Sequence, residues 1–316
     1  MQQFLLRRLF LLVPTLLGMS IIVFLMVRLL PGNIVDIITA GDTSLTDAQR
    51  AEIEDQYGLS GSLLHQYWEW LKGALQGDFG TSLRNTTPVS ETLLDALPIT
   101  LELVFLGLLI AVVVGVPLGV VSAVRRDKGS DYVSRVAGLV GVSIPSFWLA
   151  TLLLLFTSRV FHWVPQFSYI SPLDDPWENL KQFFMPALSI SVFTMAIVMR
   201  MTRATMLEVL NLDYIRTARA KGLPRRRVIF RHALRNALIP VVTIVGFEVG
   251  VLMSGAAIIE IIFGLPGVGW NLLQAIFNRD YPLVQATAVL LATTFIVFNL
   301  IVDVLYSFLD PRITLE

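Results

Sequence analysis

Six long apolar runs constrain the fold of this 316-residue chain more than any other feature. A segment in hydrocarbon satisfies its own backbone hydrogen bonds as a helix, and about 20 residues are needed to cross a bilayer. The runs lie at about 9–30, 99–124, 134–160, 185–204, 237–262 and 284–308. Only 15% of the residues are charged, whereas soluble domains average about 25%. The sequence therefore predicts an all-α, polytopic membrane protein with six transmembrane helices.

The first run resembles a signal peptide because Arg7 and Arg8 precede it. The apolar stretch nevertheless continues to Leu30, and no small-residue cleavage site follows at the usual distance. We therefore expect a retained first span.

Two further features of the runs predict local structure. Pro14, Pro117 and Pro145 fall inside predicted spans, where neighbouring helices compensate for the lost hydrogen bond, so kinks are expected there. The fourth run is short. We expect Arg200 and Arg203 to extend their charged ends to the membrane surface, with the helix continuing beyond the bilayer.

The distribution of Lys and Arg predicts the orientation. Seventeen of the 24 lie in the two termini and the loops on one side, 10 of them between Arg200 and Arg235. The other side and the span ends hold only seven. Both termini are therefore predicted to be cytoplasmic, which agrees with an even number of spans. The chain is then a single transmembrane domain with an outer loop at 31–98 and a cytoplasmic loop at 205–236.

The outer loop at 31–98 is long and acidic. Within it, Thr46 and Gln49 form a capping-box pattern that predicts a short helix ending at Gly58. A second predicted helix, Ser62 to Leu75, has one apolar face, which either packs on the span ends or lies on the bilayer. The residues of that face are Leu64, Tyr67, Trp68, Leu71 and Leu75.

The cytoplasmic loop contains a stretch that we call the basic segment, residues 213–236. Asp213 is a predicted N-cap for a helix from Tyr214 to Lys221, and Gly222 is its predicted C-cap. Pro224 suits the first turn of a second helix that runs to about Asn236. Two interpretations remain open: a solvated loop that only sets topology, or a platform that a soluble partner binds.

Motifs of catalysis are missing from the sequence. There is no G-x-x-x-x-G-K-[ST], no H-E-x-x-H and no cysteine. The glycine-rich stretch Gly264 to Gly269 has no following lysine and is predicted to be a tight outer turn. His65, His162 and His232 are distributed over both sides of the membrane. We expect no catalytic site, no metal site and no cofactor in this chain, and nothing suggests binding of nucleic acid.

Glu248 is the most unusual polar residue within a predicted span, because it lies near the membrane midplane. A buried charge there costs at least about 2.5–3.5 kcal/mol on insertion scales. Two readings stay open. Glu248 recognises a substrate amine or a partner's cation on the translocation pathway, or it is a protonated, structural residue. Glu102 and Glu260 lie nearer the interfaces, where solvation or helix–helix hydrogen bonds explain them.

The basic segment resembles the coupling loop of ABC-importer permeases, whose signature is E-A-A, three residues, Gly, nine residues, I-x-L-P. When the pattern is set on Gly222, Ala218, Gly222 and Leu234 match, while the Glu, the first Ala, the Ile and the Pro do not. The string ARAKGL…HALRNALIP is typical of the oligopeptide/dipeptide/nickel branch. Other matching stretches cover nearly the whole chain, including RLLPGN, GDFGTSL, SIPSFW and NLIVDVLYSFLDPR.

The resemblance implies a type I ABC-importer permease fold in the cytoplasmic (inner) membrane, most like the first permease subunit of a peptide transporter. It further implies a second, homologous permease, an extracytoplasmic solute-binding protein, and two ATPase subunits that bind ATP and Mg. The residues implied to couple the chain to those ATPases are Tyr214, Arg216, Thr217, Ala218, Arg219, Lys221, Gly222, His232 and Asn236.

The alternatives differ in cargo or in energy source. Within the same machinery, nickel chelates or oligosaccharides are the rival cargoes, and the sequence barely separates these from peptides. An ion-coupled secondary transporter would show inverted repeats and midplane charges in both halves. No repeat is visible here, and Glu248 is the only such charge.

Overall fold

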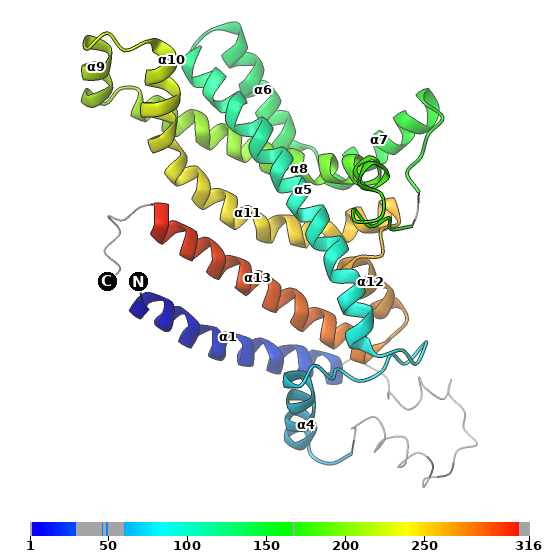
Figure 1. Ribbon diagram of the computed structural model, residues 1–316. Coiled ribbons are helices and arrows are strands. Elements are labelled where there is room, and N and C mark those ends of the chain that lie inside the picture. The colour runs from blue at the N-terminus through cyan, green and yellow to red at the C-terminus, as the bar shows by residue number, and fades with distance from the viewer. Residues whose placement is uncertain (1, 30–45, 47–48, 50–59, 167, 310–316) are drawn as a thin grey trace. The chain divides into compact units, whose positions relative to one another are not determined.

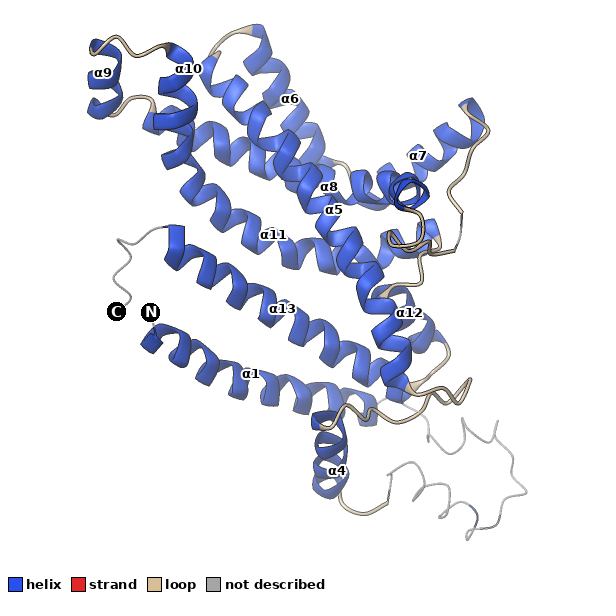
Figure 2. Ribbon diagram, in the orientation of Figure 1, coloured by secondary structure: helices blue, strands red, loops and turns tan. Residues whose placement is uncertain are grey.

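The computed structural model describes residues 2–29, 46, 49, 60–166 and 168–309. These residues form helices and loops, and the described part contains no strand beyond one isolated bridge between Thr81 and Pro88 (Figure 2). The helices in Figure 1 are α1 (Gln2–Leu29), α4 (Leu63–Leu75), α5 (Val89–Val124), α6 (Gly129–Ser143), α7 (Ser146–Val160), α8 (Pro176–Val209), α9 (Asp213–Ala220), α10 (Arg225–Arg227), the π-helical η1 (Val228–Ala233), α11 (Leu234–Phe263), α12 (Val268–Phe277) and α13 (Tyr281–Leu309). The predicted all-α class is confirmed.

Each of the six apolar runs coincides with a helix or a helix pair. Four segments in the described residues are long and apolar enough to cross a membrane: α5, α8, the continuous run from Arg225 to Phe263, and α13 as far as Ile301. A fifth is obtained when α6 and α7 are counted together. In α1, the apolar part at Leu12–Met26 is shorter than these.

The third predicted run, 134–160, is not one continuous helix. Helix α6 ends at Ser143, and the axis bends by 102° before α7 begins at Ser146. Proline has no N–H and disfavours a helical conformation in the residue before it, so Ile144 is extended and Pro145 caps α7 instead. The kink expected at Pro145 is therefore a complete break, whereas the helices continue through Pro14 and Pro117.

The described residues divide into two compact units, and the larger comprises Ile99–Pro266 together with residues 297–309. In this unit α8 packs against α6, α7 and α11 (Figure 1). Glycines bring α5 close to α8, because a Cβ on Gly119 would lie 2.6 Å from the Met199 carbonyl oxygen. At Gly115 the corresponding distance, to the Met195 carbonyl oxygen, is 2.8 Å.

The second unit comprises Gln2–Pro98 and Gly267–Ile296. Here the start of α5 packs on α12 and on the start of α13 through a small apolar cluster that includes Val89, Ala275 and Ala286. Buried Asp280 accepts hydrogen bonds from the Ser82 hydroxyl and, at 3.3 Å, from the Leu83 backbone N–H. The loop before α5 is thereby tied to the α12–α13 turn.

Helix α4, in the second unit, forms as predicted, with the Ser62 hydroxyl capping its first turn. Tyr67 packs edge-on against Phe24 of α1, with ring centroids 5.4 Å apart. Leu64, Trp68 and Leu75 are exposed, so only part of the predicted apolar face is covered within the chain. Thr46 and Gln49 form the reciprocal hydrogen bonds of a capping box, but the helix predicted to follow lies outside the described residues.

Candidate functional site

Helix α9 forms the first half of the basic segment. Asp213 is its first helical residue rather than its N-cap, a shift of one position from the prediction, because Leu212 is extended and occupies the cap. The helix ends in a left-handed turn at Gly222, with φ of +76°. The Gly222 N–H donates to the Arg219 carbonyl and the Leu223 N–H to the Ala218 carbonyl, the pattern of a Schellman cap. The helix therefore ends at the turn around Gly222, but Lys221 is its C-cap, one position before the predicted one, and Gly222 follows it.

Three of the predicted coupling residues form one hydrogen-bonded cluster between α9 and the helical run that follows it. The Asn236 side-chain amide donates to the Tyr214 hydroxyl oxygen at 2.7 Å and to the His232 carbonyl oxygen at 3.2 Å. The Tyr214 hydroxyl donates to the same carbonyl at 3.3 Å. Tyr214 is half-exposed. This cluster fixes the angle between α9 and the following helix at a position 22 residues away in the chain.

The other predicted coupling residues divide between two faces of α9. Ala218 is buried with Ile215 in an apolar cluster that also contains Met206 and Val228. Its small side chain thus serves packing within this chain and is not available to a partner. The polar residues of the set are exposed, namely Arg216, Thr217, Arg219 and Lys221. The exposed Arg216 pairs with Asp213 at 3.2 Å.

The second predicted helix does not stop near Asn236. Helix α10, the π-turn η1 and α11 join into one helix of 39 residues from Arg225 to Phe263. A π-turn inserts an extra residue into the helical ladder and is frequent at functional sites. Any displacement of the basic segment is therefore applied directly to the end of a long apolar helix.

Sequence reasoning missed a buried ion pair between α6 and α8. The Arg203 guanidinium donates to both carboxylate oxygens of Asp131, at 2.8 and 3.0 Å, and the Ser122 hydroxyl donates to the same carboxylate at 2.6 Å. The Asp131 side chain is fully buried. The structure adds that the Arg203 guanidinium is held by this carboxylate at the start of α6, and its extension to the membrane surface stays a prediction. The sequence indicated such a pair only through the positions of the two residues. Asp131 and Arg203 have opposite charges and lie near the predicted cytoplasmic ends of the third and fourth apolar runs.

Glu248 is buried in α11, and its carboxylate accepts a hydrogen bond from the Thr194 hydroxyl of α8 at 2.8 Å. Thr194 also lines a cavity of about 350 Å³ beside the α6–α7 break, together with Ser143, Ser146 and Phe193. The carboxylate thus has a polar partner within the chain and lies close to a space between helices. Both readings of Glu248 are compatible with this geometry.

Two other acidic residues of the spans bond to neighbouring elements. Glu260 is fully buried and accepts from the Thr100 hydroxyl at 2.6 Å, which is the helix–helix hydrogen bond expected of it. Glu102 accepts from the Tyr169 hydroxyl at 3.0 Å. Burial, followed by the Glu102 charge, raises the pKa of Tyr169 to about 12, so this phenol remains a hydrogen-bond donor at neutral pH.

Acidic and histidine side chains do not gather anywhere in the described residues into a group of three or more that could hold a metal ion. The polar residues instead serve helix packing, helix caps and one exposed basic surface. Such an arrangement can transmit a displacement between a soluble partner and the apolar helices.

Comparison with known proteins agrees with this architecture. Residues 115–315 match the family described as binding-protein-dependent transport system inner membrane component, and residues 1–104 match its N-terminal family. The chain belongs to this family of transporter membrane subunits. It is thus a multi-pass component that functions with other components of an ABC transporter.

Individual relatives indicate which kind of transporter subunit the chain is most similar to. The chain is 40% identical to the dipeptide transport system permease protein DppB of Alkalihalophilus pseudofirmus, over 97% of this chain and 98% of the relative. It is 39% identical to DppB of Escherichia coli K12 and 38% identical to the oligopeptide permease AppB of Bacillus subtilis, with 99% of each chain covered. A crystal structure of an amino acid ABC transporter aligns with a TM-score of 0.52 at 18% identity, over 71% of this chain and 95% of that one. This supports the fold of an ABC-importer permease.

Proposed function

We propose that this chain is a permease subunit of an ATP-driven ABC importer that moves di- or oligopeptides across the cytoplasmic membrane. The single observation that carries the proposal is near-full-length similarity, at 38–40% identity, to dipeptide and oligopeptide permeases. The chain acts with a second homologous permease, two ATP-binding subunits and an extracytoplasmic solute-binding protein. ATP and Mg are bound by the ATPase subunits, and the chain itself catalyses no reaction.

The test of cargo uses the complete complex reconstituted in vesicles, with the binding protein outside and ATP inside. We expect saturable uptake of a labelled dipeptide that requires both, and that persists when ion gradients are collapsed. Uptake that follows an ion gradient without ATP would contradict the proposal. Uptake of a nickel chelate or an oligosaccharide, with no peptide uptake, would support an ABC importer but contradict peptides as its cargo.

The basic segment is the proposed coupling site to the ATPase subunits. Its support is the division of α9 into a buried face, Ile215 and Ala218, and an exposed face that carries Arg216 and Thr217. Because the buried face packs on the chain's own core, a partner that moves α9 also moves the helices below it. The Tyr214 and Asn236 cluster and the uninterrupted helix from Arg225 carry that movement into α11.

Cross-linking tests this assignment cleanly because the chain contains no cysteine. A single cysteine at Arg216 or Thr217 should cross-link to an ATPase subunit through a short bifunctional reagent that targets thiols and amines. The matched control is Ala218→Cys, whose side chain is on the buried face of the same helix and should react poorly. Equal cross-linking from both faces, or none from the exposed face, would contradict the orientation proposed for α9.

Glu248 is the proposed polar residue of the translocation pathway. Its support is the bond to Thr194, a residue that lines the cavity beside the α6–α7 break. Glu248→Gln keeps an acceptor for the Thr194 hydroxyl and removes the charge. It should change the KM or the rate of peptide uptake while leaving the amount of assembled complex unchanged. Unchanged uptake kinetics would contradict a role in the translocation pathway and leave only the structural role for Glu248.

A further inference from the structure

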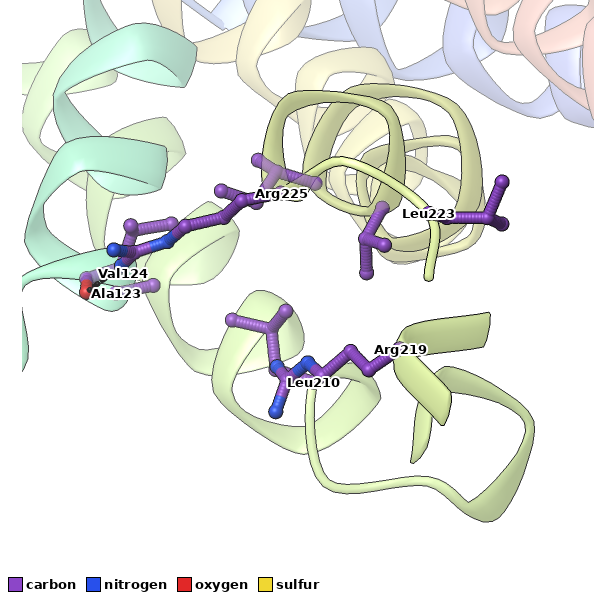
Figure 3. A pocket seen from close by; sticks show the side chains of 8 residues that line it. Ala123, Val124, Leu210, Arg219, Leu223 and Arg225 are labelled. Atoms are coloured by element: carbon purple, nitrogen blue, oxygen red, sulfur yellow. Dashed lines mark hydrogen bonds between the residues drawn. The ribbon is translucent and has the colours of Figure 1, made fainter. Parts of the chain in front are cut away.

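A second cavity lies within the larger unit, where α5 and α8 end beside the basic segment. Its volume is about 390 Å³, and Figure 3 shows Arg219 of α9 and Arg225 of α10 among the side chains around it. The rest of the lining is apolar and includes Val124, Leu210, Leu223 and Ile229. The cavity thus combines two guanidinium groups with a hydrocarbon surface.

The two arginines are held differently, and neither pairs with a carboxylate among the described residues. Arg225 donates one hydrogen bond, at 3.4 Å, to the Val124 carbonyl oxygen at the end of α5. The described residues provide no ion-pair partner for Arg219, whereas the neighbouring Arg216 on the same helix pairs with Asp213. Each guanidinium therefore retains donors that match the oxygens of a phosphate.

The position of the cavity identifies the kind of anion. Val124 is the last residue of α5, and Arg125, Arg126 and Lys128 follow it immediately. The apolar part of α5 ends here, so the cavity lies at the end of this predicted span that carries the cytoplasmic positive charge. A free phosphate would satisfy the arginines but would leave the apolar lining uncovered. An amphiphilic phosphate satisfies both parts.

We infer that this cavity binds the phosphate and glycerol region of an anionic phospholipid. The phosphate oxygens accept from Arg219 and Arg225, and the first part of the acyl chains covers Leu210, Leu223 and Ile229. A lipid held there bridges α9 to the ends of α5 and α8. The inference concerns a ligand of the chain itself and does not depend on the identity of the transported substrate.

The experiment measures binding of soluble, short-chain phosphatidylglycerol to the purified full-length chain in a neutral detergent by native mass spectrometry. The same titration is run with short-chain phosphatidylcholine and with inorganic phosphate. We expect phosphatidylglycerol to bind at least about tenfold more tightly than either, because only it carries both a net negative charge and acyl chains. Equal binding of inorganic phosphate would overturn the lipid assignment in favour of a free-anion site.

A charge-matched pair of variants separates the cavity from the general positive charge. Arg219→Gln with Arg225→Gln should weaken phosphatidylglycerol binding about tenfold relative to Arg226→Gln with Arg227→Gln. The second pair removes the same charge from the same segment, but neither Arg226 nor Arg227 lines the cavity. An equal loss in both would show non-specific attraction and overturn the inference.

A third variant tests the apolar part without changing charge. Leu210→Phe adds volume to the wall of the cavity, so it should weaken phosphatidylglycerol binding and leave any weak binding of inorganic phosphate unchanged. Unaltered lipid affinity in this variant would contradict a lipid that occupies the cavity. This measurement also decides the question if the double arginine variant fails to fold.

Discussion

The acidic residues of the long helices and the arginines of the basic segment are held in opposite ways. Asp131, Glu248 and Glu260 are buried, and each bonds to a named side chain on another helix. The basic segment keeps its charges at the surface, while the apolar cluster beneath α9 and the turn at Gly222 hold its backbone in place. These carboxylates within the helices therefore have hydrogen-bond partners inside the chain, whereas the charges of the basic segment are exposed.

The largest effect is expected where a buried charge loses its partner. Asp131→Asn removes the carboxylate that accepts both hydrogen bonds from the partly exposed Arg203 guanidinium, which should reduce the free energy of unfolding by about 1.5–3 kcal/mol. Chemical unfolding in mixed micelles measures this. The control is Asp127→Asn, because the Asp127 side chain is exposed and pairs with Arg126 at the surface, while its backbone N–H, which donates to Asp131, is kept in the variant. A similarly small effect in both variants would remove the distinction between the buried and exposed charges.

A smaller loss is expected from the backbone of the basic segment. Gly222 has φ of +76°, and a Cβ added there would meet no atom within 4 Å. Gly222→Val should therefore cost about 1–2 kcal/mol through backbone strain alone and lower coupled uptake. Gly222→Asn should retain most of both, because Asn tolerates the left-handed region. If the two variants behave alike, the conformation at Gly222 is not what the segment requires.

The cluster between α9 and the following helix should contribute less. Tyr214→Phe removes the hydroxyl that bonds to Asn236 and His232. Because the group is half-exposed, we expect a loss of about 0.5–1 kcal/mol in unfolding free energy, with a larger proportional loss of ATP-dependent uptake. Loss of stability with normal uptake would mean that the angle of α9 does not affect coupling.

The smallest effect is expected at the exposed pair between Arg216 and Asp213. Arg216→Gln should change the unfolding free energy by at most about 0.5 kcal/mol, since exposed pairs contribute little. Uptake measured at low and high salt then reports whether the charge orients a partner. A loss of stability comparable to that of Asp131→Asn would contradict the comparison between the two regions.

Features that depend on neighbours in the chain were predictable from the sequence. The apolar runs predicted the long helices, because burial of backbone polar groups in lipid leaves little choice of conformation. The turn at Gly222 and the helix from Leu63 followed from local capping rules. Even the α6–α7 break was indicated by Pro145, although its 102° angle was not.

Contacts between distant residues required the tertiary structure. Asp131 and Arg203 are 72 positions apart, and Thr194 and Glu248 are 54 apart. The sequence shows that these polar residues lie in apolar helices, but it does not show which of them form pairs. The pairing depends on how the helices pack. For the same reason, the sequence predicted Ala218 and Arg219 as members of one coupling set. In the folded chain Ala218 is on the buried face of α9, whereas Arg219 lines a cavity.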